Sequence, residues 1–359
     1  MPLKTALYQE HVNLGAKIVD FHGWDLPLHY GSQLQEHEAV RTHAGIFDVS
    51  HMTIVDISGP TTQSFLRMLL TNDIAHLQPG QALYTCMCQM DGGILDDLIV
   101  YYCHADHYRL VLNAATKHKD LEWIRQHIIP YNLSMQVRDD LAMVAIQGPQ
   151  AIEKTRAILS EAQANAVAVL APFACIESEQ VFLARTGYTG EDGLEIIATP
   201  DLIRPIWQAI LQTGVQPCGL AARDTLRLEA GLLLYGQDMD ETTTPLESGL
   251  GWTIAWEPPD RHFIGREALQ AQKQRGLERK LVGLRLLDKG VMRTGQQVMK
   301  EGHPVGVITS GSFSPALHQS IALARIAHSI QDELTVEIRQ KHYRARIGKT
   351  RFINKGKAT

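Results

Sequence analysis

The segment from Asp91 to Tyr102 constrains the fold of this chain more than any other. From Ile94 onward its residues are apolar on both faces of an extended strand, apart from Asp96 and Asp97. Successive side chains of a strand point to opposite sides, so the two carboxylates face opposite ways. A strand that is apolar on both faces is usually covered on both. Because a buried carboxylate is costly without a partner, each aspartate needs a specific reason to be there.

Two explanations for these aspartates stay open at this point. Both side chains could accept hydrogen bonds from the amides of Gly92 and Gly93, and so cap the turn before the strand. Alternatively, one of them handles a proton at the edge of a pocket, where burial raises the pKa of a carboxyl group. Composition alone does not choose between the two explanations.

The sequence around this segment alternates between the patterns of strands and helices. Strands are expected at residues 52–57, 83–89, 94–103 and 108–113, and a helix at 117–128. The arrangement then recurs, because Val144–Pro149 echoes Val55–Pro60 and a helix follows each. A second hairpin, 181–185 with 194–198, carries Glu195 at the place where the first hairpin carries Asp96. We therefore predict two related α+β units with carboxylates at corresponding positions.

The character of the chain changes beyond Lys280. Strands are expected at residues 281–286, 304–310 and 321–326 and within 335–347, and no strong helical period appears. This pattern predicts a small antiparallel barrel or sandwich. The polar stretch Gln270–Lys280 is the expected boundary, and two or three domains are expected for 359 residues.

Charge and composition exclude several classes of protein. The net charge of -5 argues against a general nucleic-acid binder, and no apolar run approaches the length of a membrane span. The N-terminus has neither a signal core nor a transit-peptide pattern, so we expect a cytoplasmic chain or a processed organellar one. Five scattered cysteines without a Cys-x-x-Cys motif favour a reducing compartment and buried thiols rather than a metal site. The chain has no Gly-x-Gly-x-x-Gly and no P-loop, so nothing favours NAD or ATP.

A glycine-rich loop precedes Glu195. Gly187, Gly190 and Gly193 recur every third residue, and such a loop can follow a ligand closely with its backbone. A carboxylate beside it can accept two parallel N–H bonds from an amide-rich ring edge. The alternative is an ordinary hairpin loop rich in glycine.

The helix expected within residues 218–231 carries two arginines. Arg223 and Arg227 lie four residues apart on one face, where like charges repel unless anions relieve them. Asp224 and Glu229 could complete a structural ion-pair network. Alternatively, one arginine holds an anionic or polar ligand.

Taken together, the motifs resemble those of the aminomethyltransferase family, the T proteins of the glycine cleavage system. The resemblance covers nearly the whole chain. It is carried by Val19-Asp-Phe-His-Gly-Trp24, Gly45-Ile-Phe-Asp-Val-Ser-His-Met52, Gly92-Gly-Ile-Leu-Asp-Asp-Leu98, Gly187-Tyr-Thr-Gly-Glu191, Ala222-Arg-Asp-Thr-Leu-Arg-Leu-Glu-Ala-Gly231 and Thr309-Ser-Gly-Ser-Phe-Ser-Pro315.

The resemblance implies an α+β fold, a three-domain cloverleaf around a folate site with a C-terminal antiparallel β-barrel. Residues 1–272 would form two intertwined α+β domains, about 1–50 with 138–272, and 51–137, and residues 279–359 the barrel. By the same resemblance Asp96 matches the catalytic carboxylate near folate N10, and Asp97 is expected to be structural. Other residues matched to the folate site are Glu195, Arg223, Tyr188, Tyr84, Asn113, Met52, Tyr235 and Trp252.

The implied reaction transfers the methylene carbon from aminomethyl-lipoyl H protein to tetrahydrofolate and releases ammonia. Tetrahydrofolate is then a co-substrate, lipoylated H protein is the partner, and no metal, nucleic acid or membrane takes part. Two relatives with the same fold remain as alternatives. One is a folate-dependent demethylase of a small methyl donor, and the other is a non-catalytic folate-binding protein of iron–sulfur assembly. The latter carries a Lys-Gly-Cys-Tyr type signature where this chain has Arg185-Thr-Gly-Tyr188.

Overall fold

The computed structural model describes residues 2–178 and 180–359. The chain divides into two compact units, the first made of residues 1–63, 76–83 and 98–226, the second of residues 64–75, 84–97 and 227–359. Strands β6 (Gln81–Cys88) and β7 (Ile94–His104) each run from one unit into the other. No single cut in the sequence therefore separates the units, and the finer division of residues 1–272 into two domains stays a prediction.

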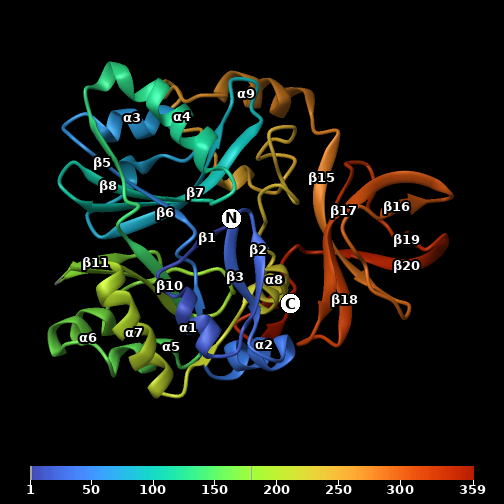
Figure 1. Ribbon diagram of the computed structural model, residues 1–359. Coiled ribbons are helices and arrows are strands. Elements are labelled where there is room, and N and C mark those ends of the chain that lie inside the picture. Colours follow the sequence, from blue (N-terminus) through green and yellow to red (C-terminus); the bar gives the residue numbers. More distant parts are fainter. Residues whose placement is uncertain (1, 179) are drawn as a thin grey trace. The chain divides into compact units, whose positions relative to one another are not determined.

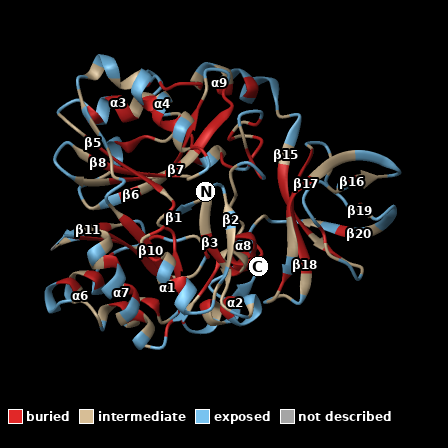
Figure 2. Cartoon of the chain, in the orientation of Figure 1, coloured by how far each residue is buried: buried red, intermediate tan, exposed pale blue. Residues whose placement is uncertain are grey.

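The first unit is built on a six-stranded sheet with the order β11-β12-β13-β10-β4-β14. Its strands are β4 (Gly45–Asp48), β10 (Ala142–Gln147), β11 (Cys175–Ser178), β12 (Val181–Ala184), β13 (Gly193–Ala198) and β14 (Gln216–Pro217). Helices α5 (Ala151–Arg156) and α7 (Pro200–Gln212) pack against β10 and β13, with α6 (Glu161–Ala168) beside α5 (Figure 1). Strands β10 and β13 are buried along their whole length (Figure 2).

Alternation along β13 directs Glu195 away from these helices. Leu194 and Ile196 belong to the core that contains Trp207 of α7, whereas Ile197 belongs to a second core on the other face of the sheet. That second core also contains Tyr101 and other residues of a five-stranded sheet with the order β6-β7-β8-β5-β9. Because alternate residues of a strand share a face, Glu195 points with Ile197 towards Tyr101.

The remaining strands and helices of the first unit complete this frame. They are β1 (Leu3–Lys4), β2 (Lys17–Phe21), β3 (Trp24–His29), β5 (Thr53–Ser58), β8 (His107–Leu112), β9 (Ser134–Val137), α1 (Tyr8–Asn13), α2 (Gln33–Thr42), α4 (Lys117–Ile128), α8 (Leu220–Ala230) and the 3-10 turn η2 (Ile129–Tyr131). The predicted helix 117–128 is confirmed at the same bounds, and the predicted strands differ from the observed ones by a residue or two at each end.

The two Gly-Pro steps that suggested a repeat adopt the same backbone conformation. Gly59 follows β5 with φ 137° and Gly148 follows β10 with φ 132°. A helix follows each step, α3 (Thr62–Leu69) in one case and α5 in the other. A Cβ on Gly148 would lie 2.6 Å from the carbonyl oxygen of His43, so only glycine fits. The matching backbone supports the predicted kinship of the two α+β segments.

The second unit ends in a closed barrel with the strand order β15-β18-β17-β16-β19-β20 (Figure 1). Its strands are β15 (Arg279–Leu286), β16 (Gln297–Lys300), β17 (His303–Ser314), β18 (Gln319–Ala327), β19 (Leu334–Ile338) and β20 (Lys341–Gly348). All neighbouring strands pair antiparallel, which confirms the predicted C-terminal barrel. The run 335–347 is a hairpin whose two turn residues, Arg339 and Gln340, both have positive φ.

Three features of this unit differ from the sequence expectation. Strand β17 continues to Ser314, whereas the predicted strand ended at Ser310. Strand β16 was not expected, because polar Gln297 and Lys300 at its ends hide its short apolar centre. The first half of the polar stretch 270–280 is helical, since it forms the end of α9 (Arg266–Arg275). The unit also contains 3-10 turns η1 (Ile74–His76), which begins in it, and η3 (Gly251–Thr253), and a final hairpin, β21 (Ile353–Asn354) with β22 (Lys357–Ala358).

Candidate functional site

Glu195 is a buried carboxylate with one oxygen occupied. Its side chain lies on β13 and is 6% exposed. Its Oε2 accepts a hydrogen bond of 2.5 Å from the Thr186 hydroxyl and one of 3.4 Å from the Tyr101 hydroxyl. Burial raises the pKa of this carboxyl group above its ordinary value, while the hydrogen bond from Thr186 opposes the shift. No described residue donates to Oε1, so that oxygen can accept hydrogen bonds from a ligand.

Arg223 lies on helix α8, and its positive charge is attracted to the carboxylate of Glu195. Its guanidinium carbon lies 4.6 Å from the centre of the Tyr188 ring, a cation–π contact. Its Nη1 is buried and has no hydrogen-bond partner among the described residues. Burial lowers the pKa of this arginine, and the attraction of Tyr188 and Glu195 opposes that shift. A buried guanidinium nitrogen without an acceptor is suited to bind an oxygen atom of a ligand.

His51 joins the same group, although the sequence did not single it out as a site residue. It is 5% exposed, and its Nδ1 is another buried atom without a partner among the described residues. Burial, followed by the charge of Arg223, lowers the pKa of His51 to about 4. Phe21 packs edge-on against the imidazole ring at 5.7 Å. We call Glu195, Arg223, Tyr188 and His51 the carboxylate–arginine group.

The glycine-rich loop before β13 packs against Gln147, and the contact of its glycines with a ligand stays a prediction. A Cβ on Gly187 would lie 1.9 Å from Gln147 Oε1, and one on Gly193 would lie 2.5 Å from Gln147 Nε2. Gln147 is 1% exposed, donates to the Thr186 carbonyl at 3.0 Å and accepts from the Thr189 hydroxyl at 2.9 Å. The loop is therefore held against a buried amide. The signal that sequence reasoning missed is a glutamine at the end of an otherwise apolar strand.

The two β7 aspartates do not cap the preceding turn. The amide of Gly92 donates to the Gln89 carbonyl at 3.0 Å, and the amide of Gly93 donates to Asp91 Oδ1 at 3.0 Å. Asp91 is therefore the capping residue, and the capping explanation for Asp96 and Asp97 is wrong. Asp96 is fully buried at 0% exposure.

Asp97 has different surroundings. It is half-buried, and its Oδ2 accepts a hydrogen bond of 2.8 Å from the Tyr84 hydroxyl. Alternation along β7 directs Asp97, Ile99 and Tyr101 to one face and Asp96 to the other. The predicted opposite orientation of the two carboxylates follows from this alternation.

An aromatic pair lies beside Asp97 in the second unit. The rings of Tyr84 and Trp252 stack with their centres 5.7 Å apart and their planes 26° apart. Trp252 belongs to η3 and is 66% exposed, which is unusual for so large an apolar side chain. Tyr235 lies nearby in the same unit, because its hydroxyl donates to the Ile94 carbonyl on β7 at 2.9 Å.

The contacts of Met52, Asn113 and Arg227 are as follows. Met52 is half-buried and packs against the core that contains Ile54. The carbonyl of Asn113 accepts a hydrogen bond from the Thr116 hydroxyl at 3.0 Å. Arg227 is a structural residue, since its guanidinium forms an ion pair of 2.8 Å with buried Asp238 and donates to Ser310 at 2.9 Å. Arg227 thus forms a structural ion pair, with Asp238, a partner that the sequence did not suggest.

Residues 2–178 and 180–359 contain no group of three or more His, Cys, Asp or Glu side chains placed to hold a metal ion. No helix within these ranges is long and apolar enough to cross a membrane.

The fold and the carboxylate–arginine group together define an α+β protein with a buried polar group and a C-terminal barrel. Residues 7–258 match the family model described as the GCVT N-terminal domain, and residues 279–354 match the glycine cleavage T-protein C-terminal barrel domain. Aminomethyltransferases from Legionella pneumophila strains Corby and Lens are 60% and 59% identical over 358 residues, which cover 99% of this chain and of each relative.

A solved structure agrees with these matches. The crystal structure of glycine cleavage system aminomethyltransferase T from Bartonella henselae has a TM-score of 0.93 and 32% identity, with 99% of each chain covered. The chain belongs to the glycine cleavage T-protein family. It is thus an enzyme with the function of a glycine cleavage aminomethyltransferase. The family uses tetrahydrofolate as a co-substrate and implies H protein as a partner. The predicted family, fold class and function are confirmed.

Proposed function

We propose that this chain transfers the methylene carbon of an aminomethyl group, carried on the lipoyl arm of H protein, to tetrahydrofolate. The observation that carries the proposal is the pairing of a buried carboxylate, Glu195, with an arginine whose Nη1 lacks a partner among the described residues. The pterin ring offers adjacent N–H donors on one edge and a carbonyl oxygen beside them. Glu195 Oε1 accepts from the donors, and Arg223 donates to an acceptor.

The reaction breaks one C–S bond and one C–N bond and forms two new C–N bonds. Folate N10 attacks the aminomethyl carbon as the dihydrolipoyl thiolate leaves, and N10 loses a proton. Ring closure through N5 then breaks the carbon–ammonia bond, and a proton returns to the leaving ammonia. A carboxylate within hydrogen-bond reach can accept the N10 proton and stabilise the developing iminium charge. Holding the two carriers in a reactive orientation supplies a further part of the rate gain.

Asp96 is the carboxylate that the family resemblance proposes for this proton transfer, and Asp97 is a second candidate. Two observations favour Asp97. It is the less buried of the two, and the Tyr84 hydroxyl orients its carboxylate at 2.8 Å.

The test compares Asp96→Asn and Asp97→Asn with Asp91→Asn as the matched control, because Asp91 caps the turn three residues before β7. The assay is tetrahydrofolate-dependent ammonia release from aminomethyl-loaded H protein, with folate affinity measured separately. The variant that removes the catalytic carboxylate is expected to keep its folate affinity and to lose turnover by about 10² to 10⁴. Asp91→Asn should stay within about threefold of the parent enzyme.

Two results would overturn the proposal. Near-normal turnover in both variants would remove the β7 carboxylates from the mechanism. A parent enzyme that releases no ammonia from H protein, but demethylates a small methyl donor, would overturn the substrate. For the pterin site, Glu195→Gln should weaken folate binding by about tenfold, since a neutral amide oxygen accepts hydrogen bonds more weakly than a carboxylate oxygen.

We also propose that the enzyme works in the cytoplasm and needs no metal. All five cysteines are free thiols, which suits a reducing compartment. Burial raises the pKa of Cys86 and Cys88, so neither thiol is primed to act as a thiolate ligand.

A further inference from the structure

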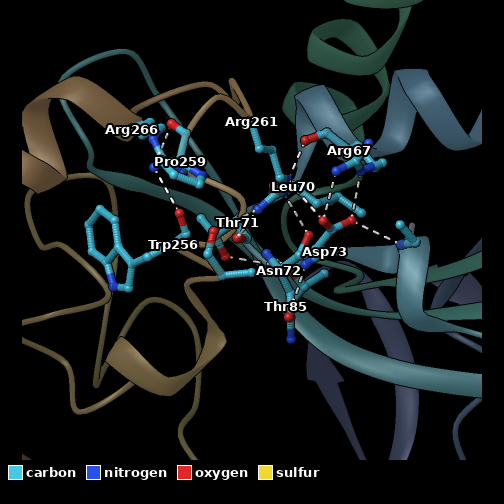
Figure 3. Close-up of polar contacts among 12 residues, drawn as sticks. Arg67, Leu70, Thr71, Asn72, Asp73, Thr85, Trp256, Pro259, Arg261 and Arg266 are labelled. Atoms are coloured by element: carbon cyan, nitrogen blue, oxygen red, sulfur yellow. Dashed lines mark hydrogen bonds and ion pairs between the residues drawn. The ribbon is translucent and has the colours of Figure 1, made fainter.

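Arg261 is a buried arginine whose hydrogen bonds go to main-chain carbonyls. It lies between η3 and α9 in the second unit and is 5% exposed. Figure 3 shows its guanidinium among the carbonyl groups of two segments. Nη1 and Nη2 donate to the carbonyls of Arg67 (2.9 Å), Leu70 (2.6 Å), Thr71 (3.0 Å), Asn72 (2.8 Å) and Ala255 (3.0 Å).

Among the described residues, no carboxylate neutralises this guanidinium at hydrogen-bond distance. Arg261 Nε lies 3.9 Å from Asp73 Oδ2, and Arg67 already donates to both Asp73 oxygens at 2.8 and 2.9 Å. Burial lowers the pKa of Arg261 to about 10. A buried cation that binds carbonyls in this way gives little net stabilisation, because its desolvation offsets its hydrogen bonds. What the arrangement does provide is a fixed geometry for residues 70–72, which follow helix α3.

The segment held by Arg261 is bonded to the strand that carries Tyr84. Asn72 Nδ2 donates to the Tyr84 carbonyl at 3.1 Å, and the Asn72 amide donates to the Thr85 hydroxyl at 3.0 Å. The Thr71 amide donates to the Cys86 carbonyl at 3.0 Å. Three consecutive residues of β6 are thereby tied to Thr71 and Asn72.

The same segment is bonded to the turn that carries Trp252. The Thr71 hydroxyl donates to the Thr253 carbonyl at 3.1 Å, one residue after Trp252. The Ala255 amide donates to the Thr71 carbonyl at 3.0 Å, and Arg261 binds that carbonyl as well. Arg261 therefore clamps the two pieces of main chain from which the stacked rings of Tyr84 and Trp252 project.

We propose that Arg261 is a positioning residue that holds Tyr84 and Trp252 parallel and thereby sets the affinity for the flat rings of the folate co-substrate. This inference rests on the proposed function for the identity of the ligand. Trp252 supplies the contact surface, since two thirds of it is exposed beside the carboxylate-bound Tyr84. The strength of an aromatic contact depends on ring separation and tilt, so a shift of either main-chain segment changes the surface that Tyr84 and Trp252 offer.

The experiment compares Arg261→Gln with Arg261→Lys in the full-length enzyme. The matched control is Arg266→Gln, because Arg266 also donates to loop carbonyls, those of Trp256 (2.8 Å) and Pro259 (3.2 Å) (Figure 3). Neither carbonyl is bonded to Thr71 or Asn72. Arg261→Gln is expected to raise KM for tetrahydrofolate by about two- to tenfold while kcat stays within about twofold. Arg261→Lys keeps the buried cation and should recover part of this loss, and Arg266→Gln should leave KM unchanged.

Two further measurements separate positioning from simple destabilisation. In a Trp252→Ala background Arg261→Gln should no longer change KM, because the ring through which it acts is gone. Without any ligand, the fluorescence assigned to Trp252 by difference from Trp252→Phe should change in Arg261→Gln and not in Arg266→Gln. A KM rise that persists in the Trp252→Ala background, or an unchanged Trp252 signal, would overturn the inference. Absence of folate activity in the parent enzyme would instead overturn the proposed function, and the ligand-free fluorescence would still decide the role of Arg261.

Discussion

The hydroxyl group of Tyr84 donates a hydrogen bond of 2.8 Å to the carboxylate of Asp97. The same tyrosine ring stacks on Trp252, so one side chain joins a carboxylate to an aromatic surface. Tyr84→Phe removes the hydrogen bond and keeps the ring. We expect kcat to fall by about tenfold and KM for tetrahydrofolate to stay within about twofold. A variant with raised KM and unchanged kcat would show that the hydroxyl serves binding rather than orientation of Asp97.

Replacement by methionine should affect stability at Arg227 and folate affinity at Arg223. Arg227 forms a buried ion pair with Asp238, and its removal leaves that carboxylate unpaired at a cost of about 3–5 kcal/mol of unfolding free energy. Arg223 has a buried Nη1 without a partner, so Arg223→Met should change stability by only about 1 kcal/mol. The affinity of the Arg223→Met variant for folate, however, should fall sharply. Urea unfolding and folate titration of both variants check this, and a large stability loss in Arg223→Met would contradict it.

Gly187→Ala tests the role of Gln147 in shaping the loop before β13. The new Cβ would lie 1.9 Å from Gln147 Oε1, and Gln147 is buried with two hydrogen bonds. We expect a loss of about 1–3 kcal/mol in unfolding free energy from overpacking. Gly348→Ala is the control, since nothing lies within 4 Å of its Cβ. The double variant Gln147→Ala, Gly187→Ala should recover stability relative to the sum of the single changes. Additive losses would mean that the two residues are not coupled.

His51 makes stability depend on pH in a defined direction. Its pKa is about 4 in the folded protein and 6.5 ordinarily, so the unfolded chain binds the proton more tightly. The stabilising contribution is therefore complete above pH 6.5 and is lost as pH falls towards 4. Between pH 7 and pH 5 the parent protein should lose about 2 kcal/mol that His51→Gln does not lose. Denaturant unfolding of both at the two pH values measures the difference. Replacing exposed His43 by Gln is the control, and equal losses in parent and His51→Gln would contradict the prediction.

Much of the fold could be predicted because it depends on local patterns. Helix α4 lies at the predicted bounds, since its apolar residues repeat at the helical period. The barrel was predicted from short alternating runs separated by turns. Strand β16 was not predicted, because its end residues, Gln297 and Lys300, are polar and its apolar centre is short. The buried state of Glu195 and Asp96 also followed from their apolar strands.

Some site residues could not be found in the same way. His51, Gln147 and Arg261 owe their surroundings to partners that are distant along the chain. Arg261, for instance, binds the carbonyls of residues about 190 positions earlier, which no periodicity reports.

The Asp91–Tyr102 segment shows which features depend on the sequence alone and which depend on the tertiary structure. The sequence by itself determined a strand covered on both faces, with two aspartates facing opposite ways, because side-chain alternation is a property of the extended backbone. Only the tertiary structure decided that Asp91 caps the turn, that Asp96 is fully buried and that Asp97 meets Tyr84. These differences depend on which side chains fold against each face, and hydrogen bonds between residues of different strands form only when the strands are brought together.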